Sequence, residues 1–235
     1  MQKILIGTPA TDSLAYKNYC LENYFSMLKE LKCSKTKLDF LVILECIQQD
    51  VAYYTAKYAR PNFRIEIQNS QLDIPERMVA CRNRMREIVI NEGYDYLMFM
   101  EQDIFPDLQT PQLLLKHQKQ ICSALYFNVV REGNQSVSYP GYNPMVWKYQ
   151  DDKIVTPAFE ELFPSTLIKF DGCGLGCVLI HRSVLEKIVF RYERDKPYFE
   201  EFYFMDDCKA HGIDIFVDTG IICRHYTRRG IDYAT

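Results

Sequence analysis

Residues 93–103 read Gly-Tyr-Asp-Tyr-Leu-Met-Phe-Met-Glu-Gln-Asp, and this stretch decides the fold. Its residues 96–100 are all apolar, which is typical of a strand buried on both faces of a parallel sheet. Gly93 is expected to end the helix before it, and Pro106 should stop the strand from continuing. The motif Glu101-Gln102-Asp103 is therefore predicted at the carboxyl end of a buried strand, where open α/β sheets bind ligands.

Short apolar runs alternate with helical patterns around this strand, which predicts an α/β fold with a mostly parallel sheet flanked by helices. Asp73 stands three residues before Glu76, with Pro75 between them, and this pattern predicts the start of a long helix. Thr8-Pro9 is expected to end the first strand. Further strands are expected at 3–7, 39–45, 64–68, 121–127, 168–171, 178–181, 215–217 and 221–223, and further helices at 16–31, 49–58, from 110, at 183–188 and at 202–211.

The stretch 131–164 differs from the rest of the chain because it is rich in Gly, Pro, Tyr and Asn. Such a composition favours turns and short strands over long regular elements. We expect a covering loop or a small subdomain there.

Composition and charge exclude several classes of protein. The net charge of −3 leaves no overall positive field, so nucleic acid is not an expected partner. Nine cysteines, an odd number without a Cys-x-x-Cys pair, favour a reducing interior over a secreted disulfide framework. No apolar run approaches the length of a signal peptide or a transmembrane helix. We therefore expect a cytoplasmic protein with a single domain over residues 1–235.

The acidic motif has a chemical interpretation. Side chains two residues apart at a strand end point to the same side. Mg²⁺ and Mn²⁺ prefer carboxylate oxygens and leave coordination positions for phosphate oxygens. Glu101 and Asp103 are thus candidates to bind a cation that neutralises a diphosphate. The alternative is that they only solvate a strand end or cap the next helix, because acid-x-acid triplets arise by chance in a chain with 31 acidic residues.

Arginines are dense in two stretches, 77–86 and 224–229. One interpretation of each cluster is an ordinary solvated face. The other is an anion site, in which Arg228 and Arg229 would hold a diphosphate by paired hydrogen bonds.

Several motifs follow the order found in glycosyltransferase family 2 and its GT-A relatives. The run Cys81-Arg82-Asn83, followed by residues 93–103, resembles the Ala-Arg-Asn helix, the strand and the Asp-x-Asp motif of these proteins. Residues 6–9, 121–126, 174–182 and 200–204, and the strand that leads to His225, are also similar to the family. The resemblance implies a GT-A fold, with a nucleotide-sugar-binding half at 1–130 and an acceptor-binding and catalytic half at 131–235.

The resemblance also implies roles for individual residues. Asp103 corresponds to the metal-binding aspartate, Glu101 stands where an aspartate is more usual, and His225 completes the metal site. Glu200-Glu201 stands in place of the family's Glu-Asp pair, which implies that Glu201 is the catalytic base. The other candidates for the catalytic base are the adjacent Glu200 and the nearby Asp206 and Asp207. The residues expected to contact the donor nucleotide are Thr8, Pro9, Arg82, Asn83, Glu101, Gln102 and Asp103.

The glycine-rich run 172–176 leads into a strand instead of a helix, which excludes a dinucleotide-binding fingerprint. Gly174 is a candidate for a close backbone approach to donor or acceptor, and a simple glycine turn is the alternative. Four aromatic residues could stack on sugar rings: Trp147, Tyr139, Tyr142 and Tyr149. The alternative is that they are ordinary buried aromatic residues.

These features predict an inverting, Mn²⁺- or Mg²⁺-dependent glycosyltransferase. It would transfer a sugar from a UDP- or GDP-sugar to a hydroxyl of a glycan, lipid or protein acceptor. One alternative is a sugar-phosphate nucleotidyltransferase, although residues 8–13 lack the basic residue expected in its loop. The other is a non-catalytic carbohydrate-binding descendant of the fold, which the unusual Glu101 and Glu200-Glu201 allow.

Overall fold

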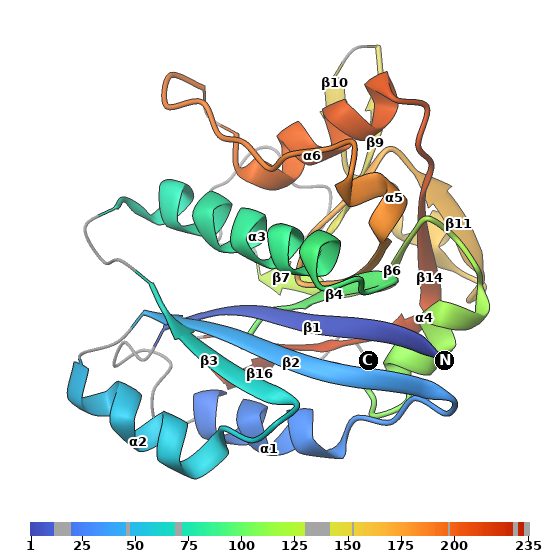
Figure 1. Ribbon diagram of the computed structural model, residues 1–235. Helices are drawn as coiled ribbons and strands as arrows, with labels where there is room; N and C mark the ends of the chain where they lie inside the picture. The colour runs from blue at the N-terminus through green and yellow to red at the C-terminus, as the bar shows by residue number, and fades with distance from the viewer. Residues whose placement is uncertain are drawn as a thin grey trace.

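We describe the protein from a computed structural model, which defines residues 1–11, 20–45, 48–68, 72–129, 142–151, 153–196, 198–227 and 230–232. An eight-stranded sheet with the order β11-β14-β6-β13-β4-β1-β2-β3 forms its centre (Figure 1). The strands are β1 (Gln2–Thr11), β2 (Thr36–Glu45), β3 (Phe63–Ile67), β4 (Tyr96–Met100), β6 (Ile121–Leu125), β11 (Leu167–Phe170), β13 (Cys177–His181) and β14 (Ile215–Ile222). Four of the seven pairings are parallel, and the three that involve β11 or β13 are antiparallel.

Helices cover both faces of this sheet (Figure 1). On one face lie α1 (Glu22–Glu30), α2 (Gln48–Tyr58) and α4 (Thr110–Lys116), and on the other lie α3 (Ile74–Asn91), α5 (Arg182–Leu185) and α6 (Glu200–Ala210). In β4, Leu97 and Phe99 join the core beneath α3, whereas Met98 and Met100 join the core beneath α1. Because alternate strand residues point to opposite faces, a central strand with two covered faces must be apolar throughout.

The remaining strands form three small sheets. Their orders are β10-β9-β12, β16-β15-β5 and β7-β8. The bounds are β5 (Ile104–Phe105), β7 (Phe127–Val129), β8 (Tyr142–Pro144), β9 (Val146–Gln150), β10 (Lys153–Val155), β12 (Gly172–Cys173), β15 (Arg224–Thr227) and β16 (Gly230–Asp232). A short 3-10 helix, η2 (Phe159–Leu162), follows β10. Short strands thus occupy the second part of the predicted covering region, while its residues 131–141 lie outside the described residues.

Several predicted strand boundaries are wrong. The strand expected at 121–127 is two strands, because β6 ends at Leu125 and β7, in another sheet, begins at Phe127. Strand β1 continues through Thr8-Pro9 to Thr11, paired with β2 along its whole length, although its pairing with β4 ends at Gly7. The Thr11 N–H donates to Gln102 Oε1 at 2.9 Å, on the β4 side. N–H groups two residues apart in a strand point to the same side, so an N–H at Pro9 would also point toward β4. The pairing with β4 has already ended at Gly7, and the proline therefore removes no hydrogen bond of the sheet. The strands expected at 215–217 and 221–223 are one strand, β14, with an irregularity between 218 and 222.

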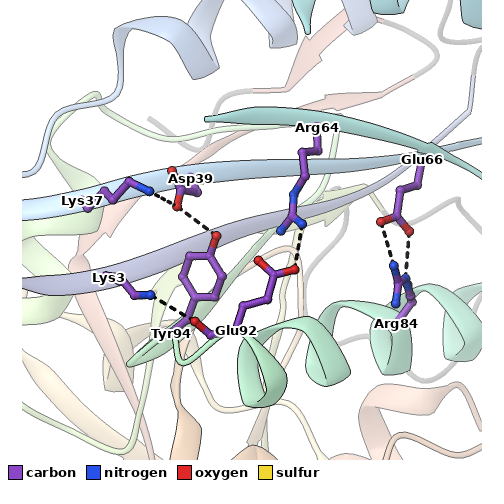
Figure 2. Close-up of polar contacts among 8 residues, drawn as sticks. All are labelled: Lys3, Lys37, Asp39, Arg64, Glu66, Arg84, Glu92 and Tyr94. Atoms are coloured by element: carbon purple, nitrogen blue, oxygen red, sulfur yellow. Dashed lines mark hydrogen bonds and ion pairs between the residues drawn. The ribbon is translucent and has the colours of Figure 1, made fainter. Parts of the chain in front are cut away.

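Polar contacts fasten α3 and the turn after it to β2 and β3 (Figure 2). Tyr94 Oη donates to the buried carboxylate of Asp39 at 2.9 Å. Arg84 makes two hydrogen bonds to Glu66, at 2.8 and 2.9 Å, on the exposed surface of the same helix. These contacts fix the helix that carries Arg82 above the sheet. The start of α3 is as predicted, because Asp73 accepts the Glu76 N–H at 3.0 Å.

The eight cysteines among the described residues are free thiols, and all except Cys33 are buried. Within the same ranges, none of the helices combines the length and the apolar character that crossing a lipid bilayer requires.

Candidate functional site

A cavity of about 510 Å³ opens at the carboxyl end of β4. Strands β1, β2 and β4 run parallel to one another, so their carboxyl ends meet at one edge of the sheet. The cavity is lined by residues from all three ends and from the start of α3, among them Pro9, Thr11, Glu45, Arg77, Gln102 and Asp103. The acidic motif therefore faces an open cavity of the size that small-molecule sites have.

Gln102 joins the motif to the end of β1. Its side chain is only 6% exposed, and its Oε1 accepts the Thr11 N–H at 2.9 Å. Glu101 is fixed from the other direction, because its N–H donates to the carbonyl of Gly176 at 2.9 Å. The motif is thus held by two segments distant in sequence, through the side chain of Gln102 and the backbone of Glu101.

Asp103 lies beside His225, as the resemblance implied. Strand β15 pairs with β5 and places His225 opposite Ile104, and the Tyr226 N–H donates to the Asp103 carbonyl at 2.7 Å. The His225 Nδ1 bonds the Phe127 carbonyl at 2.8 Å, which turns Nε2 toward the Asp103 carboxylate at 3.6 Å. Burial disfavours the charged imidazole, but the adjacent Asp103 outweighs burial and raises the pKa of His225.

Arg82 joins two carboxylates inside the protein. Its side chain has 0% exposure, its Nε donates to Glu200 at 2.8 Å, and its Nη2 donates to Glu101 at 2.6 Å. The guanidinium also lies over the ring of Phe99 at 4.7 Å. Burial opposes the charge of Arg82, but Glu200 and Glu101 raise its pKa above the usual range. The predicted donor-contacting arginine is therefore a buried bridge between β4 and α6.

The two glutamates at the start of α6 differ in environment. Glu200 is 3% exposed and accepts the Arg82 bond, whereas Glu201 is partly exposed. Burial of its carboxyl group, together with the charges of Glu200 and Glu101, raises the pKa of Glu201 to about 8, against the opposing effect of Arg82. A carboxyl group with such a pKa can exchange a proton near neutral pH, which is typical of functional sites.

The three expected metal ligands do not form one cluster. The carboxylate of Glu101 is turned to Arg82, while Asp103 and His225 face each other. No group of three or more His, Cys, Asp or Glu side chains suited to a metal ion occurs within the described residues.

Other predicted site residues have structural partners. Thr8 is fully buried and donates to Tyr24 Oη at 2.7 Å, and Tyr24 in turn donates to the Met100 carbonyl at 2.8 Å. Asn83 exchanges two hydrogen bonds with the backbone of Phe190, at 2.8 and 2.9 Å. Thr8 and Asn83 do not line the cavity, whereas Pro9, next to Thr8, does.

Gly174 belongs to a turn that packs against the ring of Tyr126. A Cβ atom at Gly174 or at Gly176 would overlap this ring, and the Gly176 N–H donates to Tyr126 Oη at 3.0 Å. The same ring meets His225 edge-on, with ring centroids 5.8 Å apart. Glycine is thus required at positions 174 and 176, because the ring of Tyr126, which also contacts His225, occupies the space that a Cβ atom would need.

Asp206 and Asp207 lie away from the cavity. Asp206 bonds Tyr149 Oη and lines a separate cleft, and Asp207 makes two bonds of 3.0 Å to the exposed Arg191. Arg228 and Arg229 lie outside the described residues.

Several cavity residues did not emerge from the sequence as site residues. Glu45 and Arg77 form an ion pair in the cavity wall, and Gln68 lies beside them. Glu45 could have been found, because it ends β2 at the edge where ligands bind. Arg77 belongs to the arginine cluster for which an anion site was one interpretation.

No protein-family model and no curated protein matches the sequence. Among solved structures, S. aureus TarS residues 1–349 in complex with UDP aligns with a TM-score of 0.51 and 13% identity, over 94% of this chain and 57% of that one. A197 from STIV aligns with a TM-score of 0.47 and 14% identity, over 100% of this chain and 96% of its own. The likeness to TarS, together with the sheet order, confirms the expected fold class: a mostly parallel GT-A sheet flanked by helices.

Proposed function

We propose that the chain is a glycosyltransferase whose nucleotide-sugar donor binds in the cavity at the carboxyl end of β4. The observation that carries this proposal is the position of Asp103, which lines a 510 Å³ cavity and faces His225 across 3.6 Å. A sheet of this class binds its ligand at this edge. TarS, with the same fold, was solved in complex with UDP. As part of the proposal, we infer that this chain also binds a nucleoside diphosphate.

The residues at this edge suit a divalent cation. Asp103 offers a carboxylate oxygen and His225 an imidazole nitrogen, and both side chains keep some exposure, 18% and 15%. Mn²⁺ accepts both ligand types and leaves positions for phosphate oxygens. When bound, the cation would neutralise the charge of the departing nucleoside diphosphate.

Glu201 is the proposed catalytic base. A carboxylate can take the proton from an acceptor hydroxyl while the new C–O bond forms, and a single displacement of this kind inverts the sugar carbon. Arg82 supports this arrangement because it binds both Glu101 in the cavity wall and Glu200 next to Glu201. The first turn of α6 is thereby held at a fixed place relative to the donor cavity.

We expect Glu201→Gln to reduce kcat by about a hundredfold, the contribution of a general base, with little change in donor affinity. Only the deprotonated form of Glu201 accepts a proton, so kcat/KM of the wild type should rise with pH as Glu201 loses its proton around pH 8. This rise should be absent in Glu201→Gln. Steady-state kinetics between pH 5 and pH 9.5 tests both points, and an unchanged pH profile would refute the assignment.

A donor screen tests the proposed function. The purified chain is mixed with Mn²⁺ and a panel of UDP- and GDP-sugars, and its melting temperature is compared with that in EDTA. A donor at a hundred times its Kd stabilises the native state by about 2.7 kcal/mol, which corresponds to roughly 5–10 °C in a chain of this size.

The proposal fails if no nucleotide sugar raises the melting temperature. The products formed from the donor that binds distinguish the two candidate activities. Release of nucleoside diphosphate supports transfer of the sugar, and release of pyrophosphate in the presence of a sugar phosphate and a nucleoside triphosphate would point to the nucleotidyltransferase instead.

A further inference from the structure

A second cleft of about 550 Å³ lies between α6 and the β9–β10 hairpin, which sit next to each other at the top of Figure 1. Its lining combines aromatic rings with a few polar groups: Tyr149, Lys153, Tyr198, Phe202, Tyr203 and Asp206. None of these residues lines the cavity at the carboxyl end of β4. The cleft is therefore a separate feature of the molecule.

The rings in this cleft form a connected series that reaches the surface. Trp147 packs on Phe202 with centroids 4.7 Å apart, and Phe202 contacts Tyr198 at 5.6 Å. Tyr198 is 44% exposed, whereas Trp147 is 6% exposed. An exposed ring supported from behind by buried rings presents a firm apolar face at little cost in conformational entropy.

Polar groups stand at the edges of these rings. The Asp206 carboxylate accepts the Tyr149 hydroxyl, and the Lys209 ammonium lies over the Tyr149 ring at 3.8 Å. Lys153 adds a second positive charge against the one carboxylate. These groups can exchange hydrogen bonds with a ligand that has many hydroxyl groups.

Tyr203 is a further polar residue of the cleft. It is 4% exposed and lines the cleft, yet its hydroxyl has no hydrogen-bond partner among the described residues. A buried phenol without a partner costs free energy, so its hydroxyl is available to a water molecule or to a ligand group that can reach it.

We propose that this cleft binds a saccharide, with a pyranose ring on the Tyr198–Phe202 face and its hydroxyl groups bonded to Asp206 and Tyr203. A pyranose has an apolar C–H face and a rim of hydroxyl groups, which matches rings that are bordered by a carboxylate and an unpaired phenol. The binding requires neither the donor nor a cation.

The position on α6 relates this cleft to the proposed function. Asp206 follows Glu201 by five residues, about 7.5 Å along the helix axis, on a different side of the helix. If the proposed transfer holds, and only then, the cleft would hold sugars remote from the reacting hydroxyl, and the acceptor would be an oligosaccharide chain.

The single tryptophan makes the test specific to the site. Trp147 is the only tryptophan in the chain, and it packs on a ring of the cleft. We titrate the full chain, without donor or cation, with disaccharides and tetrasaccharides of glucose, galactose, mannose and N-acetylglucosamine, and follow tryptophan fluorescence and heat. At least one saccharide should change the fluorescence and release or absorb heat, and both signals should saturate below a saccharide concentration of about 10 mM. Such a titration corresponds to a Kd in the millimolar range or below.

Variants locate the binding. Tyr198→Ala and Asp206→Ala should each weaken it by at least about tenfold. Tyr53→Ala, which removes a half-exposed tyrosine on α2, should bind as the wild type does. No change with any saccharide, or equal binding by Tyr198→Ala, would overturn the inference. Saccharide binding without donor binding would leave the inference standing and remove the glycosyltransferase proposal, and transfer without saccharide binding at this cleft would do the reverse.

Discussion

Asp103→Asn is expected to lower sugar transfer by at least about a thousandfold, which corresponds to about 4 kcal/mol of transition-state stabilisation. Asparagine keeps the shape of the side chain but removes the charge that would hold a cation beside His225. The fold should persist, because the contact of the Asp103 carbonyl with the Tyr226 N–H involves only the backbone. Transfer rates and the Mn²⁺-dependent rise in melting temperature, measured on both proteins, check the prediction.

Asp107→Asn is the matched control. Asp107 is an exposed acid four residues further along the chain, and it does not line the cavity at the end of β4. Its variant should retain transfer and the response to Mn²⁺. If Asp103→Asn transfers sugar as fast as the wild type, the assignment of the cation site to Asp103 is wrong.

Arg82→Met is expected to destabilise the protein by about 3–5 kcal/mol, the cost of removing one partner from a buried ion pair. The guanidinium is the hydrogen-bond partner of Glu200, which is 3% exposed, and of Glu101. Methionine fills part of the space but leaves both carboxylates without a positive charge. Urea unfolding followed by circular dichroism measures the loss in unfolding free energy.

Arg84→Met provides a control from the same helix. Arg84 also binds a glutamate through two hydrogen bonds (Figure 2), but its side chain is 50% exposed. A pair in this setting contributes less than about 1 kcal/mol. Adding Glu101→Gln and Glu200→Gln to Arg82→Met should restore part of the stability, because uncharged groups are less costly to bury. Equal losses for Arg82→Met and Arg84→Met would contradict the proposed role of the buried network.

Elements with local signals could be predicted from the sequence. The apolar run of β4 has the same bounds in the structure as in the prediction, because a central strand between two covered faces leaves no position for a polar side chain. The start of α3 also follows from a local signal, since Asp73 caps the helix three residues before Glu76.

Features that depend on contacts between distant segments could not be predicted. The antiparallel strand β13, inserted between β4 and β6, is apolar like its neighbours, and its direction leaves no mark on its sequence. Arg82 stands in an arginine cluster that suggested surface or anion contacts, but its partner Glu200 lies 118 residues away. A charge whose counter-charge comes from another element resembles a solvated charge until the fold is known.

The resemblance placed Asp103 and His225 in one site, and in the structure the two side chains lie 3.6 Å apart. No local pattern connects them, because their positions in the sequence differ by 122. The resemblance did not indicate that the carboxylate of Glu101, in the cavity wall, would form an ion pair with the buried Arg82. The glutamate has one methylene more than the usual aspartate, and this extra length lets it reach the buried guanidinium.

A crystal structure of the chain with Mn²⁺ and the nucleoside diphosphate of its best donor, with data collected near the manganese absorption edge, tests the central claim most directly. We expect an anomalous peak between the Asp103 carboxylate and the His225 Nε2, with the diphosphate beside it and the base toward Glu45 and Arg77. Manganese bound elsewhere, or a nucleotide seated away from the carboxyl end of β4, would contradict the account.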